Sequence, residues 1–142
     1  MGANLELFIE FDDSDAEPFT SDIDGVIDFS NSISITHCKP YELMQAIAGV
    51  RGDTSIKPLI DPRGFPQTIN PQVGKHINDF YGPGYKTAGW LRYSELMACL
   101  KHANLDPSTQ KESIQLVFDI LRQTKELYGD DRVRLTFIIS SA

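Results

Sequence analysis

Cationic and aromatic side chains gather in and beside two stretches rich in glycine and proline, residues 51–70 and 82–89. Guanidinium groups hold phosphate or carboxylate through paired hydrogen bonds, and aromatic rings stack on nucleobases or cations. Because binding groups concentrate in loops, we expect these side chains to converge on a cleft that binds a small anion. The predicted ligand-binding residues are Arg51, Arg63, Tyr85, Lys86, Trp90 and Arg92.

The two arginines of the first stretch also allow a structural interpretation. Arg51 follows a predicted helix and could bind the last carbonyl groups of that helix. Arg63 lies between Pro62 and Gly64, where it could pair with Glu95 and brace the loop. Buried or bracing arginines usually have a partner, so bracing and ligand binding both stay open at this point.

Other arrangements that could do chemistry are incomplete. Gly82, Gly84 and Lys86 are the residue types of a phosphate-binding loop, but a Walker motif places four residues between its glycines and the lysine directly after the second. His37 and Cys38 are neighbours in an extended segment, so their side chains point to opposite faces. We therefore predict no catalytic residues and favour a non-catalytic role over an enzyme.

Four short motifs follow one another in the chain: Val50-Arg51, then Pro62 to Pro66, Trp90-Leu91 and Glu95-Leu96. Together they resemble a family of small phage and prophage proteins, usually called hypothetical, which contain Val-Arg, Pro-Arg-Gly-Leu-Pro, Ser-Trp-Leu and Glu-Leu in this order. The resemblance covers residues 41–96 and implies a phage setting. The matching residues are Tyr41, Val50, Arg51, Pro62, Arg63, Gly64, Pro66, Trp90, Leu91, Glu95 and Leu96.

The same relatives open with Met-Gly-Cys-Asp-Ile-His and a Glu four residues later. Their Asp, His and Glu correspond to Asn4, Glu6 and Glu10, which share one face of a predicted strand. Two carboxylates could hold Mg²⁺ or Ca²⁺, so a metal-dependent nuclease or phosphodiesterase stays as a weaker alternative. Because the strongest ligands of the pattern are missing, we predict no metal site and no cofactor. We expect the two carboxylates to cover a solvent-facing sheet surface.

The net charge of −7 is a property of the N-terminal quarter, because residues 1–36 contain nine acidic residues and no Lys or Arg. Nucleic acid is a disfavoured partner, since phosphate binding requires a basic footprint. The acidic stretch from Asp12 to Asp24 is typical of a solvated loop. It could instead engage a basic surface of a host protein, as inhibitors that imitate nucleic acid do.

The length of 142 residues is enough for one hydrophobic core, so residues 1–142 are predicted to form a single domain. No apolar run approaches the roughly 20 residues of a membrane span, and no basic segment precedes an apolar one as in a signal peptide. We expect a cytoplasmic protein, in the host cell if a phage encodes it, and no membrane partner. Cys38 and Cys99 are typical of buried thiols in a reducing compartment, and a homo-oligomer is compatible with the sequence.

Alternation of apolar and polar residues predicts strands near both ends, at residues 5–11 and 132–140, and an extended region at residues 26–35. Apolar residues at helical spacing, with proline at the start and glycine at the end, predict the helices. These run from Pro40 to Gly49 or Gly52, from Pro71 to Phe80 with Asn70 as N-cap, around Leu96–Leu100, and from Asp106-Pro107 to Gly129.

The economical assembly is α+β: an antiparallel sheet pairs the N- and C-terminal strands, and about four helices pack on its one apolar face. A doubly wound sheet is disfavoured because only one predicted strand follows a helix. The sequence thus predicts a phage-type protein that sequesters a small anionic, nucleotide-like molecule, in counter-defence against host immunity. The alternative is an acidic protein-interaction or inhibitor module.

Overall fold

The computed structural model describes residues 3–14, 17–19, 25–28, 40–50, 55–66, 68–80 and 86–141. Within these ranges it describes the backbone alone at residues 3, 4, 28, 77–80, 86 and 141. Arg51, Tyr85, His37 and Cys38 therefore lie outside the described residues. The same holds for most of the extended region predicted at residues 26–35.

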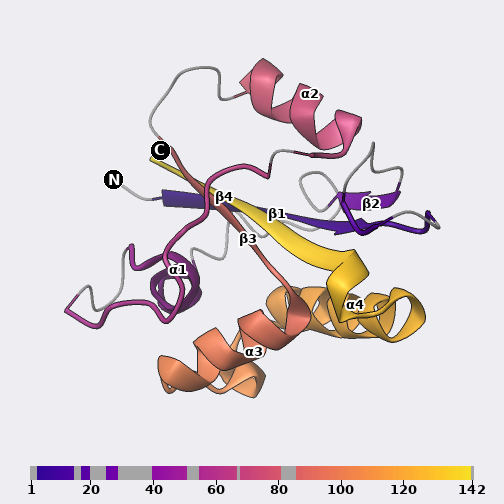
Figure 1. Cartoon of the computed structure of the whole chain (residues 1–142). Helices are drawn as coiled ribbons and strands as arrows, with labels where there is room; N and C mark the ends of the chain where they lie inside the picture. Colours follow the sequence, from indigo (N-terminus) through magenta and orange to yellow (C-terminus); the bar gives the residue numbers. More distant parts are fainter. Residues whose placement is uncertain are drawn as a thin grey trace.

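Among the described residues, one antiparallel sheet of four strands forms the centre of the molecule, in the order β2-β1-β4-β3 (Figure 1). The N-terminal strand β1 pairs with the C-terminal strand β4 along its whole length, from Ala3 opposite Ser141 to Phe11 opposite Val133. The predicted pairing of the two terminal segments is confirmed. The strands are β1 (Ala3–Phe11), β2 (Gly25–Asp28), β3 (Lys86–Leu91) and β4 (Val133–Ser141).

The helices cover both faces of this sheet. Helices α1, α3 and α4 form one layer, while α2 lies on the opposite face (Figure 1). The α+β class is confirmed, but the expectation that the helices share one face holds only for the first three. The helices are α1 (Tyr41–Ala48), α2 (Pro71–Phe80), α3 (Tyr93–His102) and α4 (Glu112–Tyr128).

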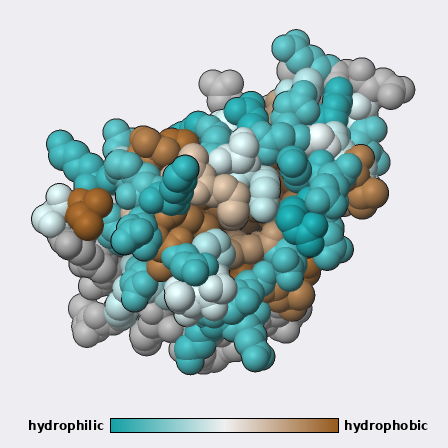
Figure 2. All heavy atoms as spheres, turned by 90° about the horizontal axis from the view of Figure 1, so that it is seen from below, coloured by the Kyte–Doolittle hydropathy of each residue, from teal (hydrophilic) through white to brown (hydrophobic). Residues whose placement is uncertain are grey.

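The main core lies between the sheet and the three-helix layer. Leu5, Leu7 and Ile9 of β1 alternate along the strand and are fully buried, together with Leu135 and Phe137 of β4. Burying one such side chain contributes roughly 1.5 to 3 kcal/mol, so this face dominates the stability of the domain. The outer surface of the layer is mostly hydrophilic, with separate hydrophobic patches and a hydrophobic hollow near its centre (Figure 2).

The second face of the sheet carries a smaller, mixed core beneath α2. Phe8 and Ile138 pack there against Val73 of α2. Glu10 and Arg134 lie on the same face and are buried as well. The expectation that the carboxylates of β1 face solvent is therefore wrong for Glu10, whose exposed fraction is 0%. Alternation alone could not reveal this, because a polar face reads the same whether water or a helix covers it.

Two helix boundaries follow the local signals closely. Helix α1 follows Pro40 and ends at Gly49, which has φ 71°. A Cβ atom at Gly49 would lie 2.8 Å from Cδ of Pro58, so both conformation and space favour glycine. Helix α2 begins at Pro71, and the side chain of Asn70 accepts a hydrogen bond of 2.8 Å from the amide of Gln72.

Two other predictions were wrong. The stretch Lys86–Gly89, expected as part of a loop, belongs to strand β3 and pairs with β4. Helix α4 begins at Glu112 and not at Asp106-Pro107, because Pro107–Thr109 form a short 3-10 turn capped by Asp106. Among the described residues, no helix has the length and apolar character that a membrane crossing requires.

Candidate functional site: a pocket of arginines and aromatic rings

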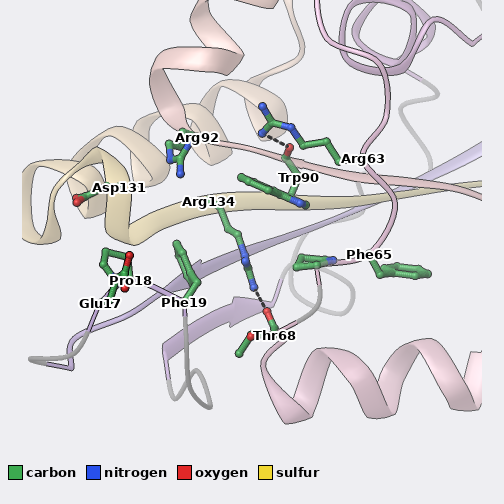
Figure 3. Close-up of a pocket in the computed structure, with 11 residues that line it drawn as sticks. Glu17, Pro18, Phe19, Arg63, Phe65, Thr68, Trp90, Arg92, Asp131 and Arg134 are labelled. Atoms are coloured by element: carbon green, nitrogen blue, oxygen red, sulfur yellow. Dashed lines mark hydrogen bonds between the residues drawn. The ribbon is translucent and has the colours of Figure 1, made fainter.

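A pocket of about 600 Å³ opens beside strands β3 and β4 (Figure 3). Its lining comes from five parts of the chain: the turn after β1, the Pro-Arg-Gly loop, the end of β3, the start of β4 and the short 3-10 turn before β4. This volume falls in the range of small-molecule sites, roughly 300 to 1,000 Å³. The lining residues are Glu17, Pro18, Phe19, Arg63, Phe65, Pro66, Thr68, Trp90, Arg92, Asp131 and Arg134.

Arg63 holds the loop against the end of β3. Its guanidinium donates to both carboxylate oxygens of Glu95, with 2.8 Å between Nη1 and Oε1, and to the carbonyl of Trp90 at 3.2 Å. It also stacks on the Trp90 ring, 4.2 Å from its centroid. The amide of Gly64 donates to the carbonyl of Ala88 at 2.9 Å, which attaches the loop to the edge strand. The geometry therefore gives Arg63 the bracing role.

Glu95 links this brace to helix α3. Its Oε1 accepts a hydrogen bond of 2.9 Å from the amide of Arg92, the residue before the helix. The hydrogen bonds from Arg63 hold the pKa of Glu95 below its ordinary value, against the opposing effect of burial. One carboxylate thus fixes the loop, the end of β3 and the first turn of α3 together.

Arg134 forms the floor of the pocket. Its Nε lies 3.1 Å from Oε1 of Glu10, and its Nη2 donates to the carbonyl of Thr68. Its guanidinium lies 4.1 Å from the centroid of the Phe19 ring and 5.8 Å from that of Trp90. Burial lowers the pKa of Arg134; Glu10 opposes this effect, and the positive charge of Arg92 adds to it. The charges of Arg92 and Arg134 therefore act on each other.

Glu10 supports Arg134 from below. Its Oε1 also accepts a hydrogen bond from the hydroxyl of Thr136, and its Oε2 accepts one of 2.7 Å from the amide of Asn70. A buried ion pair is tolerated only when such additional hydrogen bonds satisfy its remaining oxygens. This network joins β1, β4 and the start of α2 beneath the pocket.

The turn after β1 places Phe19 over Arg134. The carboxylate of Asp12 accepts hydrogen bonds from the amides of Ser14 at 3.0 Å and Phe19 at 2.8 Å. Burial alone would raise the pKa of Asp12, but these hydrogen bonds outweigh burial and lower it. Phe19 has φ 57°, a strained conformation for a bulky residue. Such strain concentrates at functional sites, and here it lies at the pocket wall.

Arg92 is the lining arginine that forms no ion pair with a described carboxylate, although its charge and that of the nearby Glu95 act on each other. Its guanidinium lies 5.6 Å from the centroid of Trp90, and its side chain forms no ion pair or hydrogen bond with any described residue. Arg63 and Arg134, by contrast, each have a carboxylate partner. Of the three lining arginines, Arg92 is therefore the one whose guanidinium is least engaged by described residues.

Three of the six predicted binding residues line this one pocket: Arg63, Trp90 and Arg92. Lys86 begins strand β3, and its side chain is not described. Arg51 and Tyr85 lie outside the described residues. Sequence reasoning missed the other lining residues, chiefly Phe19 and Arg134. The only local signal for Arg134 was a basic residue at a polar position of the C-terminal strand.

The two carboxylates weighed as metal ligands, Glu6 and Glu10, have partners within the protein. Glu6 lies 2.7 Å from Nε2 of His76 of α2, and both side chains are 14% exposed. Both oxygens of Glu10 accept hydrogen bonds from the network under the pocket. In the part of the chain that the structure describes, no three His, Cys, Asp or Glu side chains are grouped so that they could hold a metal ion. These contacts give the metal-dependent alternative no support.

Comparison with known proteins adds no further assignment, since no family model, curated protein or solved structure matches the chain. The pocket itself therefore carries the functional argument.

Proposed function

We propose that this protein binds a small anionic, nucleotide-like molecule in the pocket lined by Trp90 and does not catalyse a reaction of that molecule. The observation that carries the proposal is the guanidinium of Arg92, which forms no ion pair or hydrogen bond with a described residue and lines a pocket of about 600 Å³ together with Trp90 and Arg134. Arginine is well suited to such a site, because its planar fork matches phosphate and its face stacks on rings. In the phage setting that the resemblance implies, binding would sequester a nucleotide of the host.

The bracing contacts support the proposal because they fix the site before any ligand arrives. Arg63 and Glu95 hold Trp90 on one side, and Glu10 holds Arg134 on the other. When the binding groups are already fixed, less conformational entropy is lost as the ligand binds.

The interaction-module alternative receives less support from the acidic residues of the N-terminal quarter. Glu10 and Asp12 are buried, and each spends its carboxylate on hydrogen bonds inside the protein. Glu6 is paired with His76. These three charges stabilise the fold and are not free to meet a basic partner, although Asp13 and Glu17 are exposed.

Titration calorimetry of Arg92→Ala against the wild type tests the proposal. The titrants are inorganic phosphate and a panel of nucleoside 5′-phosphates and cyclic nucleotides. We expect at least one nucleotide to bind the wild type and to bind Arg92→Ala about tenfold or more weakly, since a hydrogen bond to a charged group contributes about 1.5 to 3 kcal/mol. The melting temperature should change little, because the Arg92 side chain loses no hydrogen bond or ion pair to a described residue, only its 5.6 Å contact with the Trp90 ring.

Arg122→Ala is the matched control. Arg122 lies on the outer face of α4, pairs with Asp119 and Glu126, and its side chain is 42% exposed. The Arg122→Ala variant removes the same charge at a residue that does not line the pocket, so it should leave the affinity for the nucleotide unchanged. If the wild type binds no titrant, or if both variants lose affinity equally, the pocket is not the binding site.

A further inference from the structure

Two opposite charges line the same pocket without pairing with each other. Arg92 precedes α3, and Asp131 lies in the 3-10 turn Asp130–Arg132. Neither side chain forms a hydrogen bond or ion pair with a described residue, and the two do not bridge to each other. The two side chains therefore line one pocket without serving as each other's partner.

The turn that carries Asp131 is held in place by its neighbour. Asp130 accepts hydrogen bonds from the amide of Ser94 at 3.1 Å and from its hydroxyl at 2.6 Å. The amide of Arg132 donates to the carbonyl of Gly129 at 3.1 Å and closes the turn. Asp130 thus has a structural task, whereas Asp131 is exposed and lines the pocket.

A simple anion would fit such a pocket poorly. Its charge would be attracted by Arg92 and Arg134 but repelled by the lining carboxylates, Asp131 among them. The repulsion turns into attraction if the ligand also carries hydrogen-bond donors that reach the carboxylate. The lining is therefore complementary to a molecule with an anionic end, a set of donors and a planar part for Trp90 and Phe19.

We propose that the ligand is a ribonucleoside 5′-phosphate and that Asp131 is the specificity residue that accepts hydrogen bonds from the ribose hydroxyls. This inference rests on the proposed function and adds the sugar to it. The phosphate lies at Arg92 and Arg134, and the base lies against the aromatic wall. Acidic side chains recognise ribose hydroxyls in the same way in dinucleotide-binding folds, which shows that this chemistry suits a carboxylate.

The test compares ribonucleoside 5′-monophosphates with their 2′-deoxy counterparts by titration calorimetry, on the wild type, Asp131→Asn, Arg92→Ala and the control Asp119→Asn. We expect the wild type to bind one ribonucleotide about tenfold more tightly than its deoxy counterpart, the ratio for one hydrogen bond to a charged acceptor. Asp131→Asn should reduce this ratio several-fold without weakening the deoxynucleotide. Arg92→Ala should weaken both nucleotides and keep the ratio.

Three results would overturn the assignment. Equal binding of ribo- and deoxynucleotides to the wild type, with both weakened by Arg92→Ala, would remove the ribose contact while leaving the proposed function intact. A ratio that Asp131→Asn leaves unchanged, or that Asp119→Asn changes equally, would show that Asp131 does not read the sugar. If no nucleotide or phosphate binds the wild type, the proposed function and this inference fail together. Because Asp131 is exposed and unpaired, its variant is expected to fold normally.

Discussion

At the scale of single residues, the arginines of the pocket divide by their partners and not by their position in the chain. Arg63 and Arg134 each stack on an aromatic ring and form an ion pair with a carboxylate, whereas Arg92 forms no ion pair with a described residue. The first two arginines are therefore mainly structural, and removing either should cost stability before it costs binding. The ordinary tolerance of surface arginines does not apply to them.

Glu95→Gln tests this division through pH. The pKa of Glu95 is lowered from its ordinary value of 4.5, mainly by the hydrogen bonds from Arg63. The ionised carboxylate therefore stabilises the fold above that pH, and the contribution is lost as the pH falls through the lower pKa of the folded state. At neutral pH the variant should be less stable by roughly 1.5 kcal/mol, the lower end for a hydrogen bond between charged groups.

Urea unfolding at neutral and acidic pH measures the difference in free energy of unfolding between Glu95→Gln and the wild type. This difference should become smaller below pH 4.5. Glu126→Gln serves as the control, since Glu126 pairs with Arg122 at 3.1 Å but its side chain is 57% exposed. Exposed pairs contribute about 0 to 1 kcal/mol, so the control should differ little from the wild type. A Glu95 effect that does not vary with pH would mean that the Arg63 pair is not ionic in character.

At the scale of elements, helix α2 connects the small core of the second sheet face to the pocket. Its N-cap Asn70 is 3% exposed, and the backbone amide of the same residue donates to Glu10. The preceding residues supply Thr68 and Phe65 to the pocket wall. A local signal of only two residues, Asn70-Pro71, thus sets where the loop ends and where the network beneath Arg134 begins.

Asn70→Ala should destabilise the domain by about 1 kcal/mol, because it removes the side-chain acceptor for the amide of Gln72. Hydrogen exchange should show faster exchange first in the amides of α2. Asp106→Ala removes a similar acceptor from the exposed 3-10 turn at Pro107–Thr109 and should cost less. Equal costs for the two variants would mean that the capping of α2 does not depend on its buried setting.

At the scale of the whole molecule, the strand β4 is the element that no other can replace. It lies between β1 and β3 in the sheet, and it contributes residues to both the main core and the polar network. Because β4 pairs with β1 and with β3, these contacts join residues that are far apart in the sequence. Folding should therefore be a single cooperative event that requires the C-terminal segment.

Deleting residues 132–142 should abolish cooperative unfolding, because it removes the hydrogen-bonding partner of both β1 and β3. Circular dichroism during heating would show a gradual change in place of a sigmoidal melt. Leu127→Ala, at a side chain that is 79% exposed, is the control. It should keep a sigmoidal melt, and its free energy of unfolding should lie within about 0.5 kcal/mol of the wild-type value. A sharp melt in the truncated chain would contradict the central role of β4.

Local patterns in the sequence determined the elements whose signals are complete within a few residues. The alternation in β1 and β4 and the punctuation at Pro40, Gly49 and Asn70-Pro71 predicted strands and helix ends close to those observed. The resemblance and the loop composition pointed to Arg63, Trp90 and Arg92, which do line one pocket. The class of fold followed because two terminal strands of equal length have few other ways to pair.

Only the tertiary structure decided which elements cover each face of the sheet and which arginines form ion pairs. The composition of Lys86–Gly89 is typical of a loop, but the segment forms the first part of β3 because it pairs with β4. The paired residues lie about fifty positions apart in the sequence. Glu10 and Arg134 read as surface residues until α2 and the turn at Phe19 cover them. Arg63 and Arg92 have the same chemistry in the sequence. Only the tertiary structure shows that Arg63 forms an ion pair with Glu95, 32 residues away, while Arg92 forms none with a described residue.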